Sequence, residues 1–387
     1  MNLGAHALYG GGAAEQVVLR ELGIAYSGHR PMHLSVLRAG KFYQYPDSTS
    51  ALLRTRLLDL RDKLELASMF SKLPGLKPET LARVSVADWI MTVAKRPRVL
   101  QFLRMLACTS TYSAALDQVS AEVLVHNLQL ITKHPLQYID GGWQTLVDGL
   151  RQQAVQAGVQ INNGLRVEAV EQQDRQVRGV RLANGQRIEA RAVIVATTPQ
   201  EAVKLLDEES AAPLKSYLDN MLPAELACLD VALRSLPDPM RPIVQNLEGP
   251  HFLTTQSCFA QIAPEGGAII HTFKQLDPQH PSDPHDDERE LEALLDRVQP
   301  GWRDLLVKRV FLPRINGVSM LPTTSIGGYA GRPGTQATNI DQLYLIGDWI
   351  GEGFLVNASM NSARQAARLF LQDQASRHVS REEAVLQ

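Results

Sequence analysis

Residues 343–359, LYLIGDWIGEGFLVNAS, are the stretch of sequence that decides the fold. Residues 343–346 form a continuous apolar run that ends at Gly347 and Asp348, which is typical of a short buried strand. Two further glycines mark a loop, and the small residues after them predict a helix over about 357–371. A strand, a glycine loop and a helix in this order indicate an α/β protein.

The same stretch has the chemistry of a ligand site. Backbone N–H groups at the start of a helix favour an electron-rich ligand atom. Asp348 stands at the carboxyl end of the strand, where its carboxylate can accept hydrogen bonds from ligand hydroxyls. The alternative is an ordinary packing unit whose helix is capped by Asn357, and the residues alone leave both interpretations open.

Other elements can be expected along the chain. Residues 140–206 predict a helix, short strands, a hairpin that turns at Asn184-Gly185, a strand at 192–196 buried on both faces, and another helix. Residues 50–73 predict one amphipathic helix, because apolar residues recur at steps of three and four. The positions expected to face the core are Leu53, Leu57, Leu60, Leu64 and Ala67.

Composition excludes several classes of protein. The chain has 387 residues, of which 44% are hydrophobic and 21% charged, so it is neither disordered nor a disulfide scaffold. A net charge of −2 gives no basic excess for nucleic acid. No apolar stretch approaches the roughly 20 residues of a membrane-spanning helix, which leaves peripheral contact with a membrane open. The three cysteines lie far apart, and with no signal peptide at Met1 we expect reduced thiols in a cytoplasmic protein.

The motifs of other enzyme classes are missing. The sequence contains no G-x-S-x-G, H-E-x-x-H or P-loop motif. Residues 280–288 hold histidines and carboxylates, but two prolines and the lack of a fixed period favour a solvated loop and helix start over a metal site. We therefore predict no metal, and no catalytic side chain can be named.

Three segments, in order, resemble FAD-dependent oxidoreductases of the phytoene dehydrogenase, protoporphyrinogen oxidase and flavin amine oxidase superfamily. They cover most of the chain at matching spacing. The segments are NLGAHALY at 2–9, a set beginning YIDGGWQTL at 138–146 and ending VIVAT at 193–197, and GD at 347–348 followed by NAS at 357–359 and SARQAA at 362–367.

The resemblance implies a fold and a division of the chain. We expect an α/β protein in which an incomplete, Rossmann-like FAD-binding domain of the glutathione-reductase type is interleaved with an α+β substrate domain. The expected FAD-binding part covers 1–22, 135–206 and 335–372, the substrate part covers 23–134 and 207–334, and 373–387 form a polar tail.

The resemblance also implies which residues bind FAD. Val167 would offer its backbone beside the adenine, Asp348 would hold the ribityl or pyrophosphate region, and amides at the start of the last helix would face the pyrimidine edge of the flavin. The predicted cofactor-binding residues are Val167, Thr197, Gly347, Asp348, Asn357, Ala358 and Ser359. Gly4 and His6 would lie near the flavin, where His6 has either a structural role or an acid–base one.

One part of the family pattern is missing from the sequence. Full-length members begin with a βαβ unit whose G-x-G-x-x-G turn holds the pyrophosphate. The cluster Gly10-Gly11-Gly12 does not fit, because Glu15 stands where the third glycine belongs. A misplaced start, a truncated gene, or a partner chain that supplies the unit would each explain this. We expect the chain alone to bind FAD poorly.

The resemblance narrows the substrate. Amine oxidases of the family carry a lysine on a strand that corresponds to 223–233, and this chain has none there. We therefore predict the dehydrogenation of an apolar small molecule, either isoprenoid (phytoene-like) or a porphyrinogen, in which no charged side chain takes the proton. The alternatives are a non-catalytic remnant or subunit that needs a partner chain, and an amine oxidase.

Overall fold

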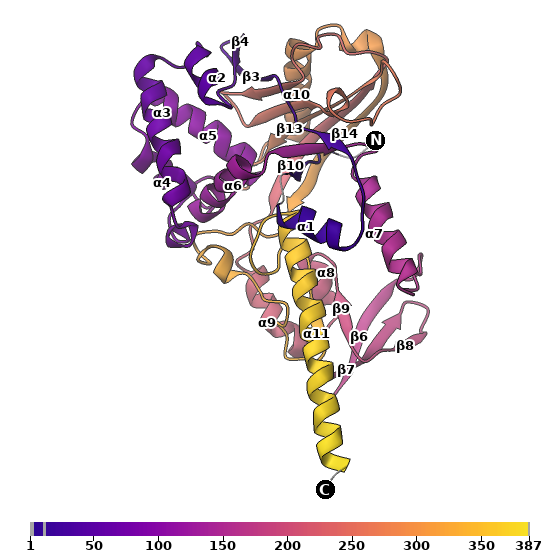
Figure 1. Cartoon of the computed structure of the whole chain (residues 1–387). Helices are drawn as coiled ribbons and strands as arrows, with labels where there is room; N and C mark the ends of the chain where they lie inside the picture. The colour runs from indigo at the N-terminus through magenta and orange to yellow at the C-terminus, as the bar shows by residue number, and fades with distance from the viewer. Residues whose placement is uncertain (1–3, 11–12, 386–387) are drawn as a thin grey trace. The chain divides into compact units, whose positions relative to one another are not determined.

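A computed structural model describes residues 4–10 and 13–385, with side chains described up to residue 375 (Figure 1). The chain divides into two compact units. Unit 1 comprises Met1–Val159 and Ala224–Gly317, and unit 2 comprises Gln160–Pro223 and Val318–Gln387. Unit 1 thus includes 4–10, 13–22 and 135–159, which the sequence analysis assigned to the FAD-binding part. Compactness does not test a functional division, so that division stays a prediction.

Unit 1 is built on a seven-stranded mixed sheet. Strands β10 and β13 lie side by side within it and pair antiparallel, with Asp230 directly opposite His271. In sheet order the strands are β14 (Leu306–Val318), β10 (Ala224–Leu233), β13 (Ala268–Gln275), β12 (His251–Thr255), β11 (Ile243–Asn246), β3 (Leu34–Arg38) and β4 (Lys41–Gln44).

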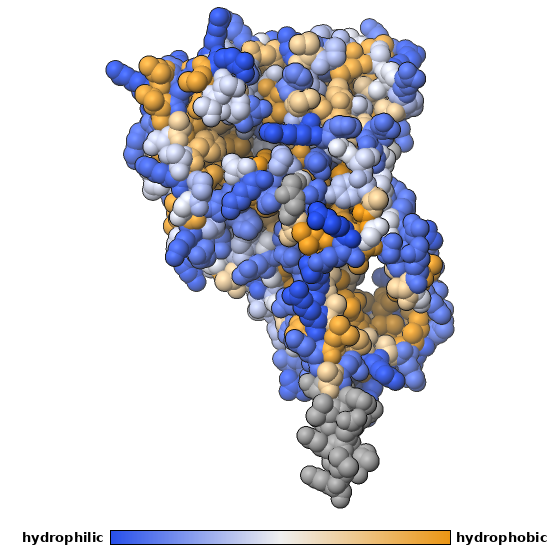
Figure 2. All heavy atoms as spheres, viewed as in Figure 1, coloured by the Kyte–Doolittle hydropathy of each residue, from blue (hydrophilic) through white to orange (hydrophobic). Residues whose placement is uncertain are grey.

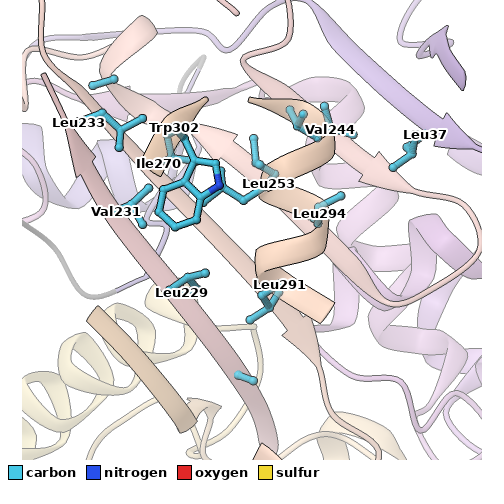
Figure 3. Close-up of a cluster of buried hydrophobic side chains, with 14 of the residues drawn as sticks. Leu37, Leu229, Val231, Leu233, Val244, Leu253, Ile270, Leu291, Leu294 and Trp302 are labelled. Atoms are coloured by element: carbon cyan, nitrogen blue, oxygen red, sulfur yellow. The ribbon is translucent and has the colours of Figure 1, made fainter. Parts of the chain in front are cut away.

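Helix α10 (Pro284–Val298) covers one face of this sheet. Alternate residues of β10 point to this face because successive side chains of a strand alternate. Leu229 and Val231 pack there against Leu291 and Leu294 of the helix, and Trp302 is almost fully buried in their midst (Figure 3). Burial of these side chains anchors the helix to the sheet.

The opposite face carries a second apolar cluster. Its buried members are Tyr138, Leu226, Cys228, Ile243, Phe252, Phe259, Ala260 and Phe273. Asp230 lies two residues after Cys228 on β10, so both side chains point to the same face of the sheet. The Asp230–His271 pair therefore lies on this face. We call this surface of the sheet the aromatic face.

The remaining elements of unit 1 are helices and a small sheet. Strand β5 (Leu136–Ile139) lies between β1 (Leu8–Tyr9) and β2 (Gly28–His29). The helices are α1 (Ala14–Glu21), α2 (Thr49–Arg54), α3 (Leu60–Lys72), α4 (Val86–Val93), α5 (Pro97–Thr111), α6 (Ala121–Lys133) and α7 (Gln144–Gln156), with short 3-10 turns at Leu73–Gly75, Pro78–Leu81, Gln256–Cys258 and Trp302–Leu305.

The single helix expected over 50–73 is wrong. The chain breaks after α2, because Thr55 is extended and Asp59 starts α3 with a capping box. The break turns the predicted apolar stripe outward. Leu57 is buried, but Leu53, Leu60 and Leu64 are exposed. Figure 2 shows hydrophobic side chains scattered among hydrophilic ones on the face in view.

Unit 2 combines a parallel strand pair with an antiparallel sheet. Strand β15 (Leu343–Leu345) pairs parallel with β9 (Val193–Val195), and β6 (Val167–Gln173), β7 (Gln176–Leu182) and β8 (Arg187–Glu189) form the other sheet. The predicted turn at Asn184-Gly185 is confirmed between β7 and β8. The helices are α8 (Pro199–Lys204), α9 (Glu208–Leu218) and α11 (Val356–Val385), with a 3-10 turn at Gly328–Gly331. The predicted α/β class is confirmed.

Strand β9 is less buried than predicted. Val195 packs in the unit 2 core with Leu343 and Leu345, whereas Ile194, on the other face, is 50% exposed. Within the described residues β9 pairs with β15 alone, so its second edge carries no strand. Separately, none of the described helices is long and apolar enough to cross a membrane.

Candidate functional site

The predicted site at the end of β15 requires glycine. Gly347 has a φ of 149°, and a Cβ placed on it would lie 2.9 Å from Nε1 of Trp349. Its amide donates to the hydroxyl of Ser362 on α11, 3.1 Å away. The backbone therefore turns sharply where the strand ends and stays tied to the helix that follows.

Trp349 joins this turn to β9. Its indole Nε1 donates to the carbonyl of Thr197 at 2.9 Å, and the ring is buried. The structure thus brings Thr197 and the 347–349 turn together, as expected for one site. The carbonyl of Thr197 accepts from Trp349, and its hydroxyl donates to the carbonyl of Thr198 at 3.3 Å, so what remains for a ligand is the hydroxyl oxygen as an acceptor. The sequence did not indicate Trp349.

Asp348 is half-buried and directed by a backbone amide. Its Oδ2 accepts from the N–H of Ser319 at 2.7 Å. No hydrogen bond is recorded for Oδ1 among the residues that the structure describes. Asp348 therefore has one oxygen that holds the chain and one that can accept from a ligand hydroxyl.

The start of α11 offers fewer amides than predicted. The N–H of Asn357 donates to the carbonyl of Phe354 at 3.1 Å, and that of Ser359 to Leu355 at 3.2 Å. Among the described residues, no backbone acceptor is recorded for Ala358. Of the three predicted positions, Ala358 thus has the amide suited to a ligand, and the dipole of a long helix supports it.

A buried arginine holds the glycine loop before α11. The guanidinium of Arg332 donates to the carbonyl of Gly353 at 2.9 Å and to that of Met320. Gly353 has a φ of 102°, and a Cβ there would lie 2.7 Å from Oδ1 of Asn357. The sequence did not indicate Arg332, because no local pattern links it to residues 12 and 21 positions away.

Val167 lies in a different sheet from the other predicted residues. It opens β6 opposite Leu182, and the register shifts between Val167 and Ala169. No contact with Thr197 or Asp348 is recorded. Val170 of the same strand packs in the core around β15 and β9, so the two sheets share a core.

Unit 1 holds a polar cluster that the sequence did not indicate. Asp230 and His271 are both fully buried on the aromatic face, with Oδ1 of Asp230 2.7 Å from Nδ1 of His271. The amide of Gly4 donates to Oδ2 of Asp230 at 2.8 Å. His6 lies nearby with its ring against Trp143, the ring centroids being 5.4 Å apart. Residues 41 positions apart in sequence carry no pairing signal, which is why the pair was missed.

Solved structures of an oxidoreductase and of two oxidases share this fold at low sequence identity. An oxidoreductase from Methanosarcina mazei matches with a TM-score of 0.72 and 16% identity, over 94% of this chain and 87% of that one. Putrescine oxidase bound to putrescine matches with a TM-score of 0.66 and 12% identity, over 94% of this chain and 87% of that one. Cyclohexylamine oxidase from Brevibacterium oxydans matches with a TM-score of 0.62 and 14% identity, over 95% of this chain and 87% of that one. No curated protein matches the sequence.

Two family models each match more than half of the chain. The model described as FAD dependent oxidoreductase matches residues 116–363, and that described as flavin containing amine oxidoreductase matches 2–223. The site fits such a cofactor, since Asp348 Oδ1 suits a hydroxyl and the Ala358 amide suits an electron-rich ring atom. The chain belongs to the FAD-dependent oxidoreductases of the flavin amine oxidase superfamily, and its cofactor is FAD.

Proposed function

We propose that the protein dehydrogenates an apolar small molecule of the isoprenoid or porphyrinogen kind. The observation that carries this is the aromatic face, whose side chains are mainly apolar and aromatic. Strand β10 has no lysine, although it corresponds to the strand that carries one in the amine oxidases of the family. Burial raises the pKa of its Cys228 thiol, so that this group stays neutral. Lys274 of β13 lies on the other face, bound to Asp287 and Glu290.

FAD performs the redox step when bound, by taking up two electrons and a hydrogen from the substrate. The residues of this chain then have to bind and orient. In unit 2, Asp348 and Ala358 would hold FAD, with Thr197, Gly347, Asn357 and Ser359 shaping the turn around it. Val167 would contribute its backbone from β6. In unit 1, the partly buried hydrophobic residues packed against the aromatic face, such as Ala5, Ala7 and Ile315, would contact the substrate.

A partner segment is part of the same proposal. The free edge of β9 and the exposed Ile194 suit a βαβ segment that adds a parallel strand, buries that side chain and supplies a glycine turn for the pyrophosphate. The chain alone should then bind FAD weakly. Purified protein that retains near-stoichiometric FAD would contradict the need for such a segment.

Amine oxidation is the second candidate. It is favoured by the family description and by the named activities of two similar structures, putrescine oxidase and cyclohexylamine oxidase. Against this candidate, β10 lacks the lysine that amine oxidases of the family carry on the corresponding strand. As for location, all three cysteines are unpaired, which supports a reducing compartment such as the cytoplasm.

Anaerobic reduction of the bound flavin separates the two candidates. FAD-loaded protein is mixed with protoporphyrinogen or with phytoene in detergent, and in parallel with putrescine or cyclohexylamine, while flavin absorbance near 450 nm is followed. Bleaching by an apolar substrate, with the amines inert, is expected. Rapid bleaching by either amine alone would replace the proposal by amine oxidation.

A further inference from the structure

We propose that Asp230 and His271 are positioning residues for His6, and that His6 accepts the proton that the substrate loses on dehydrogenation. This deepens the proposed function and rests on it. The three residues come from different segments, namely β10, β13 and the chain just before β1. All lie within unit 1, and none was assigned a role by the family matches.

Hydrogen bonds lead from Asp230 to the His6 ring. Oδ2 of Asp230 accepts from the amide of Gly4 at 2.8 Å, which fixes the backbone of that glycine at a φ of 75°. The carbonyl of Gly4 lies 3.2 Å from Nδ1 of His6. Since a carbonyl can only accept, Nδ1 carries the hydrogen, and in the neutral ring Nε2 keeps a lone pair.

Two further contacts hold the His6 segment. The side-chain amide of Gln256 donates to the carbonyl of His6 at 2.7 Å, and the ring of Trp143 packs against the imidazole. The residue is thereby fixed at its backbone and at its ring. A proton acceptor has to be held at a set position to be effective, so these contacts are those expected of a functional histidine.

His271 orients the carboxylate that begins this series. Its Nδ1 donates to Oδ1 of Asp230, so both oxygens of the buried carboxylate are satisfied. Nε2 of His271 is buried with no hydrogen-bond partner among the described residues. His271 and the Gly4 amide therefore hold the Asp230 carboxylate in one orientation.

The surroundings favour a neutral His6. Burial lowers the pKa of its imidazole, and the Gly4 carbonyl opposes this less strongly. Of the neighbouring ionisable groups, His271 adds to this lowering of the pKa and Asp230 opposes it. The other ionisable groups of this face are neutral, since burial raises the pKa of the Cys228 thiol and raises that of Tyr138 to about 12. His6 can thus accept a proton near pH 7.

The proton balance of the reaction needs such an acceptor. When two neighbouring C–H bonds become a C=C bond, the substrate gives one hydrogen with both bonding electrons to FAD. The second carbon gives up a bare proton, and the electron pair of that C–H bond forms the new π bond. Nε2 of neutral His6 takes this proton and becomes cationic until it exchanges with solvent. A neutral acceptor agrees with the prediction that no charged side chain removes the proton.

Histidine NMR tests the positioning without substrate or FAD. The full chain is labelled with ¹⁵N-histidine and titrated, with His6 and His271 identified from the His6→Gln and His271→Gln variants. We expect a neutral His6 ring with its hydrogen on Nδ1, and a hydrogen on Nδ1 of His271. Asp230→Asn can keep its one oxygen for the Gly4 amide and turn its NH2 toward His271, so it should move the His271 hydrogen to Nε2 and leave His6 nearly unchanged. Asp230→Ala also removes the acceptor of the Gly4 amide, so it should make His6 a mixture of tautomers. An unchanged His6 spectrum in a folded Asp230→Ala protein would overturn the positioning role.

Flavin reduction tests the proton transfer. With protoporphyrinogen or phytoene as the probe, His6→Gln should slow anaerobic bleaching about 100-fold or more and remove the rise of the rate with pH, while FAD affinity stays unchanged. His280→Gln, on an exposed loop, is the matched control. A His6→Gln rate equal to wild type would refute the acceptor role. Wild-type protein inert to both probes would instead refute the proposed function, and the NMR result would stand.

Discussion

Replacement of Asp348 separates its role in the chain from its role toward the cofactor. Asp348→Ala removes the carboxylate that accepts from the Ser319 amide, 2.7 Å away. A loss of about 1–3 kcal/mol in the free energy of unfolding is expected. It also removes a charge-assisted bond to an FAD hydroxyl, which is worth about 1.5–3 kcal/mol, or about 10- to 150-fold in affinity.

Asp348→Asn is the informative variant. It keeps one oxygen for Ser319 and loses the charge, so FAD-free protein should melt close to wild type while FAD affinity still falls, though less than in Asp348→Ala. Affinity is measured by quenching of FAD fluorescence, and melting by circular dichroism. Asp341→Ala serves as a control, because that residue is exposed and has only backbone bonds recorded. Unchanged FAD affinity with a lowered melting temperature in Asp348→Ala would refute the cofactor role.

Three other predictions concern both units. Trp302→Ala should cost about 3–5 kcal/mol in urea unfolding, since the ring fills the centre of the unit 1 core; a loss under 1 kcal/mol would show that the core collapses around it. Gly347→Ala should displace Trp349 and weaken FAD binding, and a variant with wild-type affinity and melting would count against the strained turn. Burial lowers the pKa of His251, so the unfolded state binds a proton at a higher pH than the native state does. The free energy of unfolding should therefore fall from about pH 6.5 toward pH 5. His251→Gln should flatten that slope in pH-dependent urea titrations, His280→Gln should not, and equal slopes would contradict the assignment.

Local patterns predicted the elements of unit 2 well. The apolar run before Gly347, the glycine loop and the helix after it are near neighbours in sequence, and the structure confirms a strand and a helix there. The Asn184-Gly185 turn is likewise a local signal. The exposure of Ile194 could not be predicted from the same patterns, because it depends on which distant element covers that face of β9.

Contacts between residues far apart in the chain could not be predicted from local sequence patterns. Asp230 meets His271 only because β10 and β13 pair in one register, and the amide of Gly4 reaches Asp230 from 226 positions away. The single helix expected over 50–73 was wrong for a reason that is visible in the sequence. Asp59 and Asp62 form a capping box in the middle of that stretch and start a new helix there. The resemblance to flavoenzymes named the cofactor, but it did not show which amides of α11 were already bonded.

The central claim is that residues 343–359 bind FAD. A crystal structure of the chain grown with excess FAD tests this claim most directly. We expect FAD beside the end of β15, with Asp348 Oδ1 within hydrogen-bond distance of a cofactor hydroxyl and the Ala358 amide facing the flavin ring. FAD bound elsewhere, or bound here with neither residue in contact, would contradict it.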